Sequence, residues 1–274
     1  MFPTFNVWKP CRHGLMVFNP QDAYVGRSLD LYGEYSYGEV QLFEQVLRPG
    51  EVVVEVGANI GAHTLALAKA VGPAGRVFAF EPQRILSQTI SANLALNSIT
   101  NGVIRNEAVG AVAGVLAVPS LDYSAKANYG GLPLGPEAAW LEKKVPFEEI
   151  PVVTLDSVQL LQCRLLKIDV EGMEADVLRG AKETIAQCRP LLYVENDRTD
   201  KAAELVGLMK ELGYDLHWHT PPLFLPDNFA KNAENVFGNI LSFNVFGVPS
   251  EWTDFNLTGF APVTDPVHPA LKPQ

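Results

Sequence analysis

The residues best suited to hold a charged ligand are two acids that flank a glycine-rich turn. Glu55 lies in a Val-rich run, Gly57 and Gly61 follow it, and Glu81 closes the next apolar run. Glycine has no Cβ, so the backbone at such a turn can come close to a ligand. A carboxylate at the end of the second strand can accept hydrogen bonds from both hydroxyls of a ribose. The pattern therefore predicts half of a nucleotide-binding α/β unit.

The spacing of these residues distinguishes between ribose-bearing cofactors. A dinucleotide site has the spacing G-x-G-x-x-G and places a pyrophosphate at the helix N-terminus. Here the spacing is Gly57-x-x-x-Gly61, and the carboxylate of Glu55 would repel a pyrophosphate. S-adenosylmethionine carries an ammonium group and no phosphate, so it fits better. We predict an enzyme that uses this cofactor. The alternatives are an NAD-dependent oxidoreductase and a non-catalytic module that binds S-adenosylmethionine.

Polar residues also end two later strands, where they are suited to catalysis. Asp169 and Glu171 alternate in an extended segment and point the same way, as do His217 and His219 in another. Methyl transfer to oxygen requires an aligned acceptor hydroxyl and a base that takes its proton. Imidazole can act as that base near neutral pH, so His219 and then His217 are the predicted bases. The alternative is that they are two ordinary histidines beside a loop.

The elements that must position these residues alternate along the chain. Val-rich runs without polar alternation indicate strands covered on both faces, and segments of helical periodicity lie between them. We expect strands over residues 52–56, 76–81, 102–106, 165–170, 190–195, 214–219 and 239–248. Alternating strands and helices predict an α/β fold with an open, mostly parallel seven-stranded sheet and helices on both faces. Ligands in such folds bind at the carboxyl ends of the strands.

The composition of the 274-residue chain excludes several classes of partner. The net charge is −10 and no basic run occurs, which argues against a nucleic-acid acceptor. Three cysteines match no zinc motif, and the N-terminus lacks the features of a signal peptide. No apolar run is long enough to span a membrane. We therefore expect a soluble cytoplasmic protein with no nucleic-acid or membrane partner, and the oligomeric state stays undetermined.

Three stretches carry a resemblance to a known family. The runs Val52–Glu81, Leu165–Ala181 and His219–Phe224 resemble the FkbM family of S-adenosylmethionine-dependent methyltransferases, over roughly residues 33–248. The most specific part is the I-D-V-E-G-x-E block that begins at Ile168. The resemblance implies a class I methyltransferase fold, which is Rossmann-like, and methyl transfer to oxygen, commonly on sugars or secondary metabolites. The acceptor would thus be a hydroxyl of a small molecule or sugar.

The resemblance also implies roles for individual residues. The methionine end of the cofactor would be held by Glu55, Gly57, Asn59 and Gly61, with His63 near its carboxylate and Asp169 near its amino group. Glu81 would hold the ribose, and Glu107 and Ala108 would edge the adenine. We count Asp169 with His217 and His219 as a candidate catalytic residue.

A metal provides a second route to an activated hydroxyl. Asp169, Glu195 and Asn196 are similar to the Asp, Asp-Asn arrangement of catechol O-methyltransferase, with Glu in place of one Asp. Their oxygens could hold Mg²⁺, which lowers the pKa of a bound hydroxyl. Mg²⁺ is thus a candidate cofactor. The alternative is that these acids bind the ammonium group of the methionine or cap helices.

The domain organisation follows from the same patterns. We expect an N-terminal extension over residues 1–38 that caps the substrate side, and a methyltransferase domain over 39–248. An insertion or lid, rich in Gly, Pro and Ala, covers 110–150, and a tail follows over 249–274. The Tyr-rich segment 30–39 lines a pocket or is an ordinary loop.

Overall fold

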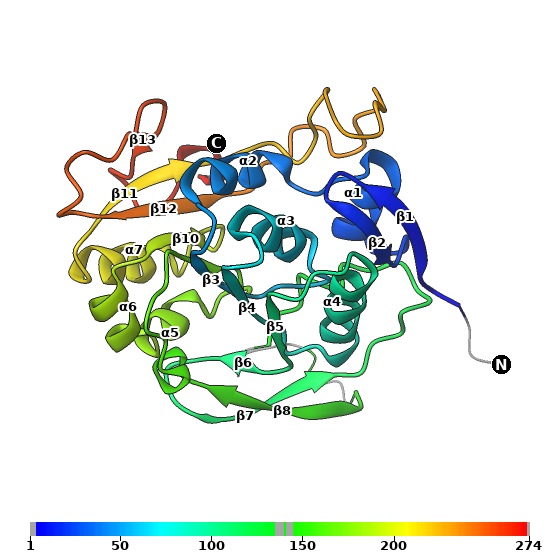
Figure 1. Ribbon diagram of the computed structural model, residues 1–274, viewed down its shortest axis with the longest axis horizontal. Helices are drawn as coiled ribbons and strands as arrows, with labels where there is room; N and C mark the ends of the chain where they lie inside the picture. The colour runs from blue at the N-terminus through cyan, green and yellow to red at the C-terminus, as the bar shows by residue number, and fades with distance from the viewer. Residues whose placement is uncertain (1–3, 135–139, 141–144, 273–274) are drawn as a thin grey trace.

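The computed structural model describes residues 4–134, 140 and 145–272. A large twisted sheet lies at its centre, with helices on both sides (Figure 1). The strands are β1 Val7–Cys11, β2 Gly14–Phe18, β3 Val52–Val56, β4 Arg76–Phe80, β5 Gly102–Arg105, β6 Ala108–Val109, β7 Gly114–Pro119, β8 Phe147–Val153, β9 Leu165–Ile168, β10 Leu191–Glu195, β11 Tyr214–His219, β12 Asn244–Pro249 and β13 Ala261–Pro262. The helices are α1 Val25–Tyr32, α2 Tyr37–Val46, α3 Ala62–Val71, α4 Arg84–Leu96, α5 Glu174–Arg179, α6 Lys182–Cys188 and α7 Ala202–Glu211.

The order of strands in the central sheet confirms the predicted fold class. The sheet has the order β13-β11-β12-β10-β9-β3-β4-β5. The strands from β10 to β5 are parallel, and β12 lies antiparallel between β10 and β11. This is the Rossmann-like α/β arrangement of class I methyltransferases. The sheet has eight strands rather than the predicted seven, because the two-residue β13 pairs with β11 and is too short to show a periodic pattern.

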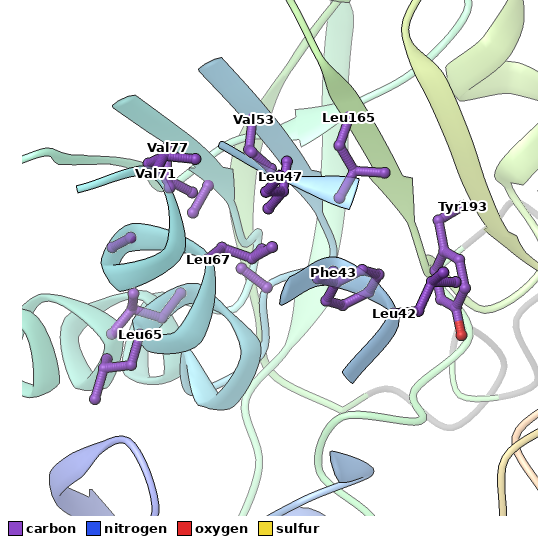
Figure 2. Packing of buried hydrophobic residues seen from close by; sticks show 14 of the residues in the cluster. Leu42, Phe43, Leu47, Val53, Leu65, Leu67, Val71, Val77, Leu165 and Tyr193 are labelled. Carbon is purple, nitrogen blue, oxygen red and sulfur yellow. The ribbon is translucent and has the colours of Figure 1, made fainter. Parts of the chain in front are cut away.

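The apolar residues of the central strands alternate between two cores. Val53 and Val54 are both 0% exposed, and they pack into different clusters on the two faces of the sheet. Helices α2, α3 and α4 supply the first cluster, and α5, α6 and α7 supply the second. Figure 2 shows the first, where Phe43 and Leu67 lie beneath Val53 and Leu165. Burial on both faces explains the absence of polar alternation in these strands.

Smaller elements surround the sheet and were only partly predicted. The hairpin β1–β2 packs on α4, and β6, β8 and β7 form a separate three-stranded sheet (Figure 1). Helix α1 was not predicted. Between β9 and β10 the chain forms two helices, α5 and α6, because it bends at Gly180, where a Cβ would lie 2.0 Å from the carbonyl oxygen of Gly110. In the part of the chain described, no helix is both long and apolar enough to cross a bilayer.

Candidate active site

The turn after β3 brings three strand ends together. The N–H groups of Gly57 and Ala58 donate to the carbonyl oxygen of Phe80, over 3.0 and 3.1 Å. Gly57 has a φ of 83°, and a Cβ there would lie 1.7 Å from the carbonyl oxygen of Asp169. Only glycine allows both this backbone conformation and this close approach. The turn therefore holds the ends of β4 and β9 beside its own backbone.

Glu81 follows β4 and is held by backbone donors. Its Oε1 accepts from the N–H of Gln83 and its Oε2 from the N–H of Asn59, each over 2.9 Å. The residue is only 5% exposed, and this burial raises its pKa to about 8, although the two N–H groups partly offset the effect. Each oxygen retains a second lone pair. Glu81 is thus oriented to accept hydrogen bonds from a ligand, as the sequence predicted for a ribose.

Glu55 lies in β3 before the turn, and His63 lies in α3 after it. The Thr64 hydroxyl donates to Glu55 Oε2 over 2.6 Å, and burial raises the Glu55 pKa to about 7. His63 is 5% exposed, and burial, with the charge of Lys167, lowers its pKa to about 3. The imidazole is therefore neutral at physiological pH. Its buried Nε2 has no hydrogen-bond partner among the described residues, which suits a site completed by a polar ligand.

Two adjoining cavities lie at the carboxyl ends of the strands. The larger has a volume of about 400 Å³, which is within the usual range for small-molecule sites. The smaller lies beside Phe80, Glu107 and Ala108. Both cavities are lined by Gly57, Glu81, Gly130, Asp169 and Glu171. The predicted cofactor residues that line the larger cavity are Glu55, Gly57, Asn59, His63, Glu81 and Asp169. Gly61 is the exception among the turn residues, since it packs against Ile90.

Asp169 lies where the two cavities meet and pairs with a buried lysine. Its Oδ2 lies 3.1 Å from Lys167 Nζ; the lysine side chain is 2% exposed and that of Asp169 36%. Burial alone would raise the pKa of Asp169, but the charge and hydrogen bond of Lys167 outweigh it and hold the pKa below its ordinary value. Burial would likewise lower the Lys167 pKa, yet Asp169, Glu55 and Glu39 raise it. Both groups are therefore charged at neutral pH.

The structure does not support the predicted metal site. Glu195 lies in the larger cavity and hydrogen-bonds with Asp169, and burial and the charge of Asp169 raise its pKa. Asn196 instead donates its amide to the carbonyl oxygen of Pro266 over 2.9 Å and lines neither cavity. The carboxylate of Asp169 already forms an ion pair with Lys167. Among the residues described, no group of three His, Cys, Asp or Glu side chains is placed to hold a metal ion.

The two histidines of β11 also lie outside both cavities. His219 Nδ1 is 2.9 Å from the hydroxyl of Tyr193, and its ring contacts Phe260 of the C-terminal tail. His217 is in the part of β11 that pairs with β13. Neither lines a cavity, so the predicted role of direct base does not fit the geometry. The reason is that β11 lies two strands beyond β10 in the sheet, and His219 is hydrogen-bonded to Tyr193 of β10.

The sequence interpretation missed several residues that line the larger cavity. Tyr24 precedes α1, Leu223 and Ser242 come from the segment before β12, and Arg198 follows β10. These residues are far apart in the sequence and form no motif. Lys167 did carry a signal, because a lysine within an apolar buried strand must have a charged partner nearby.

Comparison with known proteins identifies the family. Residues 55–216 match the family model described as methyltransferase FkbM domain, and the chain belongs to this family. It is 27% identical over 202 residues to "Methyltransferase sdnD" of Sordaria araneosa, covering 60% of this chain and 73% of that protein. The protein is therefore an S-adenosylmethionine-dependent methyltransferase, as predicted, which sets aside the NAD-dependent alternative.

Solved structures with similar folds are more distant. A methyltransferase FkbM from Methylobacillus flagellatus KT is 18% identical, with a TM-score of 0.47. The match covers 82% of this chain but only 55% of that one. A putative methyltransferase from Streptococcus mutans, solved in complex with SAH, is 12% identical with a TM-score of 0.42; the match covers 76% of this chain and 94% of that one.

Proposed function

We propose that this protein transfers the methyl group to a hydroxyl of a small molecule or sugar. The observation that carries the proposal is the position of Asp169. Its charged carboxylate lies where the two cavities meet, and Lys167 and Glu195 fix its orientation. An oxygen acceptor must lose a proton, and a fixed carboxylate at the transfer point can take it.

The residues that line the cavities fit the cofactor. Glu81 would accept from the ribose hydroxyls, and Glu107 and Ala108 would contact the adenine in the smaller cavity. Glu55 would face the methionine end, as would Nε2 of His63, which has no hydrogen-bond partner in the described part of the chain. When bound, the cofactor supplies a methyl group on a positively charged sulfur. We call the lining made by these residues the cofactor half of the site.

The remaining lining of the larger cavity would hold the acceptor. Tyr24, Tyr35 and Leu223, which belong to one apolar cluster, line it, as do Asp197 and Arg198 after β10. We call these residues, with Glu171, Glu195 and Ser242, the acceptor half. In this proposal the segment 1–38 contributes to the substrate side through Tyr24 and Tyr35.

Within this arrangement the residues act by orientation and proton transfer. The acceptor hydroxyl would donate a hydrogen bond to Asp169, which orients the oxygen and takes the proton as the new bond forms. Lys167 is a positioning residue, because its ammonium group keeps Asp169 ionised and directed into the cavity. An acceptor bound against the apolar side chains of the acceptor half would displace water from the cavity.

A small acceptor agrees better with the charge of the chain than a nucleic acid does. The net charge is −10, and the lining of the larger cavity contains more acids than bases. A polyanionic backbone would be repelled from this opening.

The test is methyl transfer by the Asp169→Asn variant. A panel of hydroxylated small molecules and sugars is incubated with methyl-labelled cofactor, and products are read by mass. We expect wild-type transfer and a loss of about 100-fold or more in the variant. Asp254→Asn, an exposed position that lines neither cavity, should keep wild-type activity. Binding of S-adenosylhomocysteine without transfer to any acceptor would favour the non-catalytic alternative.

A further inference from the structure

The smaller cavity is lined mainly by apolar side chains, among them Phe80, Leu116, Leu132 and Met173. These residues come from β4, from β7 and from the segments that follow β7 and β9. In the lining as described, the only side chain that carries an N–H group is the amide of Gln83. Such a space suits a flat ring with few polar groups.

The side chain of Gln83 is held in one orientation just before α4. It is 4% exposed, and its Nε2 donates to the carbonyl oxygen of Tyr129 over 2.7 Å. A rotated amide would place two carbonyl oxygens against each other, so this hydrogen bond fixes which end is the nitrogen. The Oε1 atom is therefore directed away from the Tyr129 carbonyl, and it has no hydrogen-bond partner among the described residues.

The side chains of the described lining do not supply the donor that Oε1 lacks. The amide of Gln83 is already used on Tyr129. Glu107 differs from Gln83, because its Oε2 lies 2.7 Å from Nε of Arg105 and its Oε1 accepts from the same guanidinium over 3.0 Å. Buried amide oxygens almost always have a partner, so Oε1 of Gln83 is suited to a donor on a ligand in the smaller cavity.

A purine with an amino group supplies a donor of this kind. Adenine is a flat ring that carries one amino group, whereas hypoxanthine carries an oxygen at the same place. That oxygen accepts hydrogen bonds, so beside Gln83 it would leave two acceptors facing each other without a proton between them. A buried acceptor left unpaired costs more than a hydrogen bond contributes. A site built to bond a polar group therefore rejects an analogue that lacks it.

We propose that Gln83 selects the nucleobase of the cofactor, because its Oε1 accepts a hydrogen bond from the amino group of adenine. This inference rests on the proposed function, since it assumes that the adenine occupies the smaller cavity beside Glu107 and Ala108. It makes Gln83 a specificity-determining residue, and the deaminated cofactor a poor ligand.

The experiment compares three ligands that differ in the group on the ring carbon that bears the amino group of adenine. They are S-adenosylhomocysteine itself, its purine analogue with a hydrogen there, and its hypoxanthine analogue with an oxygen. Affinities are measured by calorimetry on the full chain. We expect the wild-type protein to bind the amino ligand about tenfold more tightly than the hydrogen ligand, and the oxygen ligand most weakly.

The same series is then measured on Gln83→Met, which keeps a side chain of similar length and removes Oε1. The advantage of the amino ligand over the hydrogen ligand should fall to about twofold or less. This ratio is the readout, because a general loosening of the site would weaken the ligands alike. Gln41→Met makes the same change at an exposed position of α2 that lines neither cavity, and it should keep the wild-type ratio.

The outcomes separate this inference from the proposed function. Equal binding of the amino and hydrogen ligands by the wild-type protein would overturn the role of Gln83 while the cofactor site stands, and this measurement needs no variant to fold. A preference undiminished in Gln83→Met, with folding checked by thermal unfolding, would also overturn it, since another group would then read the base. If none of the three ligands binds the wild-type protein, the proposed function itself fails.

Discussion

The two halves of the site are built in different ways. The cofactor half uses a tight turn and the buried carboxylate of Glu81, which two backbone N–H groups hold, and all of its residues lie within the matched family domain, 55–216. The acceptor half combines residues from separate parts of the chain, and Tyr24, Tyr35 and Leu223 lie outside that domain. A cofactor site fixed by local backbone geometry can therefore be kept while the acceptor surface changes. Substitutions in the two halves should have separable effects.

The largest effect is expected at Gly57. In Gly57→Ala the new Cβ would lie 1.7 Å from the Asp169 carbonyl oxygen, at a φ of 83°. We expect a loss of about 3 kcal/mol or more in the free energy of unfolding, and loss of S-adenosylhomocysteine binding. Gly50→Ala is a matched control, since Gly50 has a φ of 92° but no atom within 4 Å of a Cβ. It should lose about 1–2 kcal/mol from backbone strain alone. Urea unfolding measures both, and equal losses would contradict the close approach.

Substitution of Glu81 should lower the cofactor affinity, whereas substitution of an acid in the acceptor half should not. Glu81→Gln removes a charged acceptor for ribose hydroxyls, so S-adenosylhomocysteine should bind about 10–100-fold more weakly by calorimetry. Asp197→Asn, an acid of the acceptor half, should change that affinity by no more than about twofold. If both variants lose cofactor affinity alike, the division of the site is wrong.

The pH dependence of cofactor binding tests the same carboxylate. Burial raises the pKa of Glu81 to about 8 in the free protein, and hydroxyl donors favour its ionised form, which lowers that pKa in the complex. The free protein then holds the extra proton below about pH 8, so affinity for S-adenosylhomocysteine should rise from pH 6 to 8 and level off above. Titration calorimetry across this range should show a smaller rise in Glu81→Gln. An undiminished rise would assign the titration to another group.

Substitution of Tyr24 should weaken binding of the acceptor and leave binding of the cofactor unchanged. Tyr24→Ala removes ring surface from the larger cavity, so the KM for a hydroxylated acceptor found in the screen should rise about tenfold. The affinity for S-adenosylhomocysteine should stay within about twofold of wild type. Steady-state kinetics and calorimetry measure the two quantities, and a loss confined to cofactor affinity would place Tyr24 in the other half.

The smallest effect is expected at His219, which the sequence indicated as the base. His219→Gln removes the hydrogen bond to Tyr193, which is worth about 1 kcal/mol of stability. Because His219 lines neither cavity, turnover should remain within about threefold of the wild-type rate in steady-state kinetics. A large loss of turnover, about 100-fold, with unchanged stability would restore His219 as the base and would count against Asp169.

Much of the cofactor half could be predicted because its chemistry is local. Glu55, Gly57 and Glu81 follow apolar runs at fixed spacing, and parallel strands bring such strand ends to one edge. The acceptor half could not be predicted in the same way. Tyr24 and Leu223 come together only through the packing of α1 and of the segment before β12.

The sequence by itself determined the strand ends, the turn and the acids that follow them, because alternation and glycine conformations are properties of neighbouring residues. Only the tertiary structure decided which polar side chains reach the cavity. Asn196 donates a hydrogen bond to Pro266 of the tail, His219 is hydrogen-bonded to Tyr193, and Lys167 forms an ion pair with Asp169. At the end of a strand, the direction of a side chain depends on partners from distant segments, and their positions are fixed by burial and charge pairing across the whole fold.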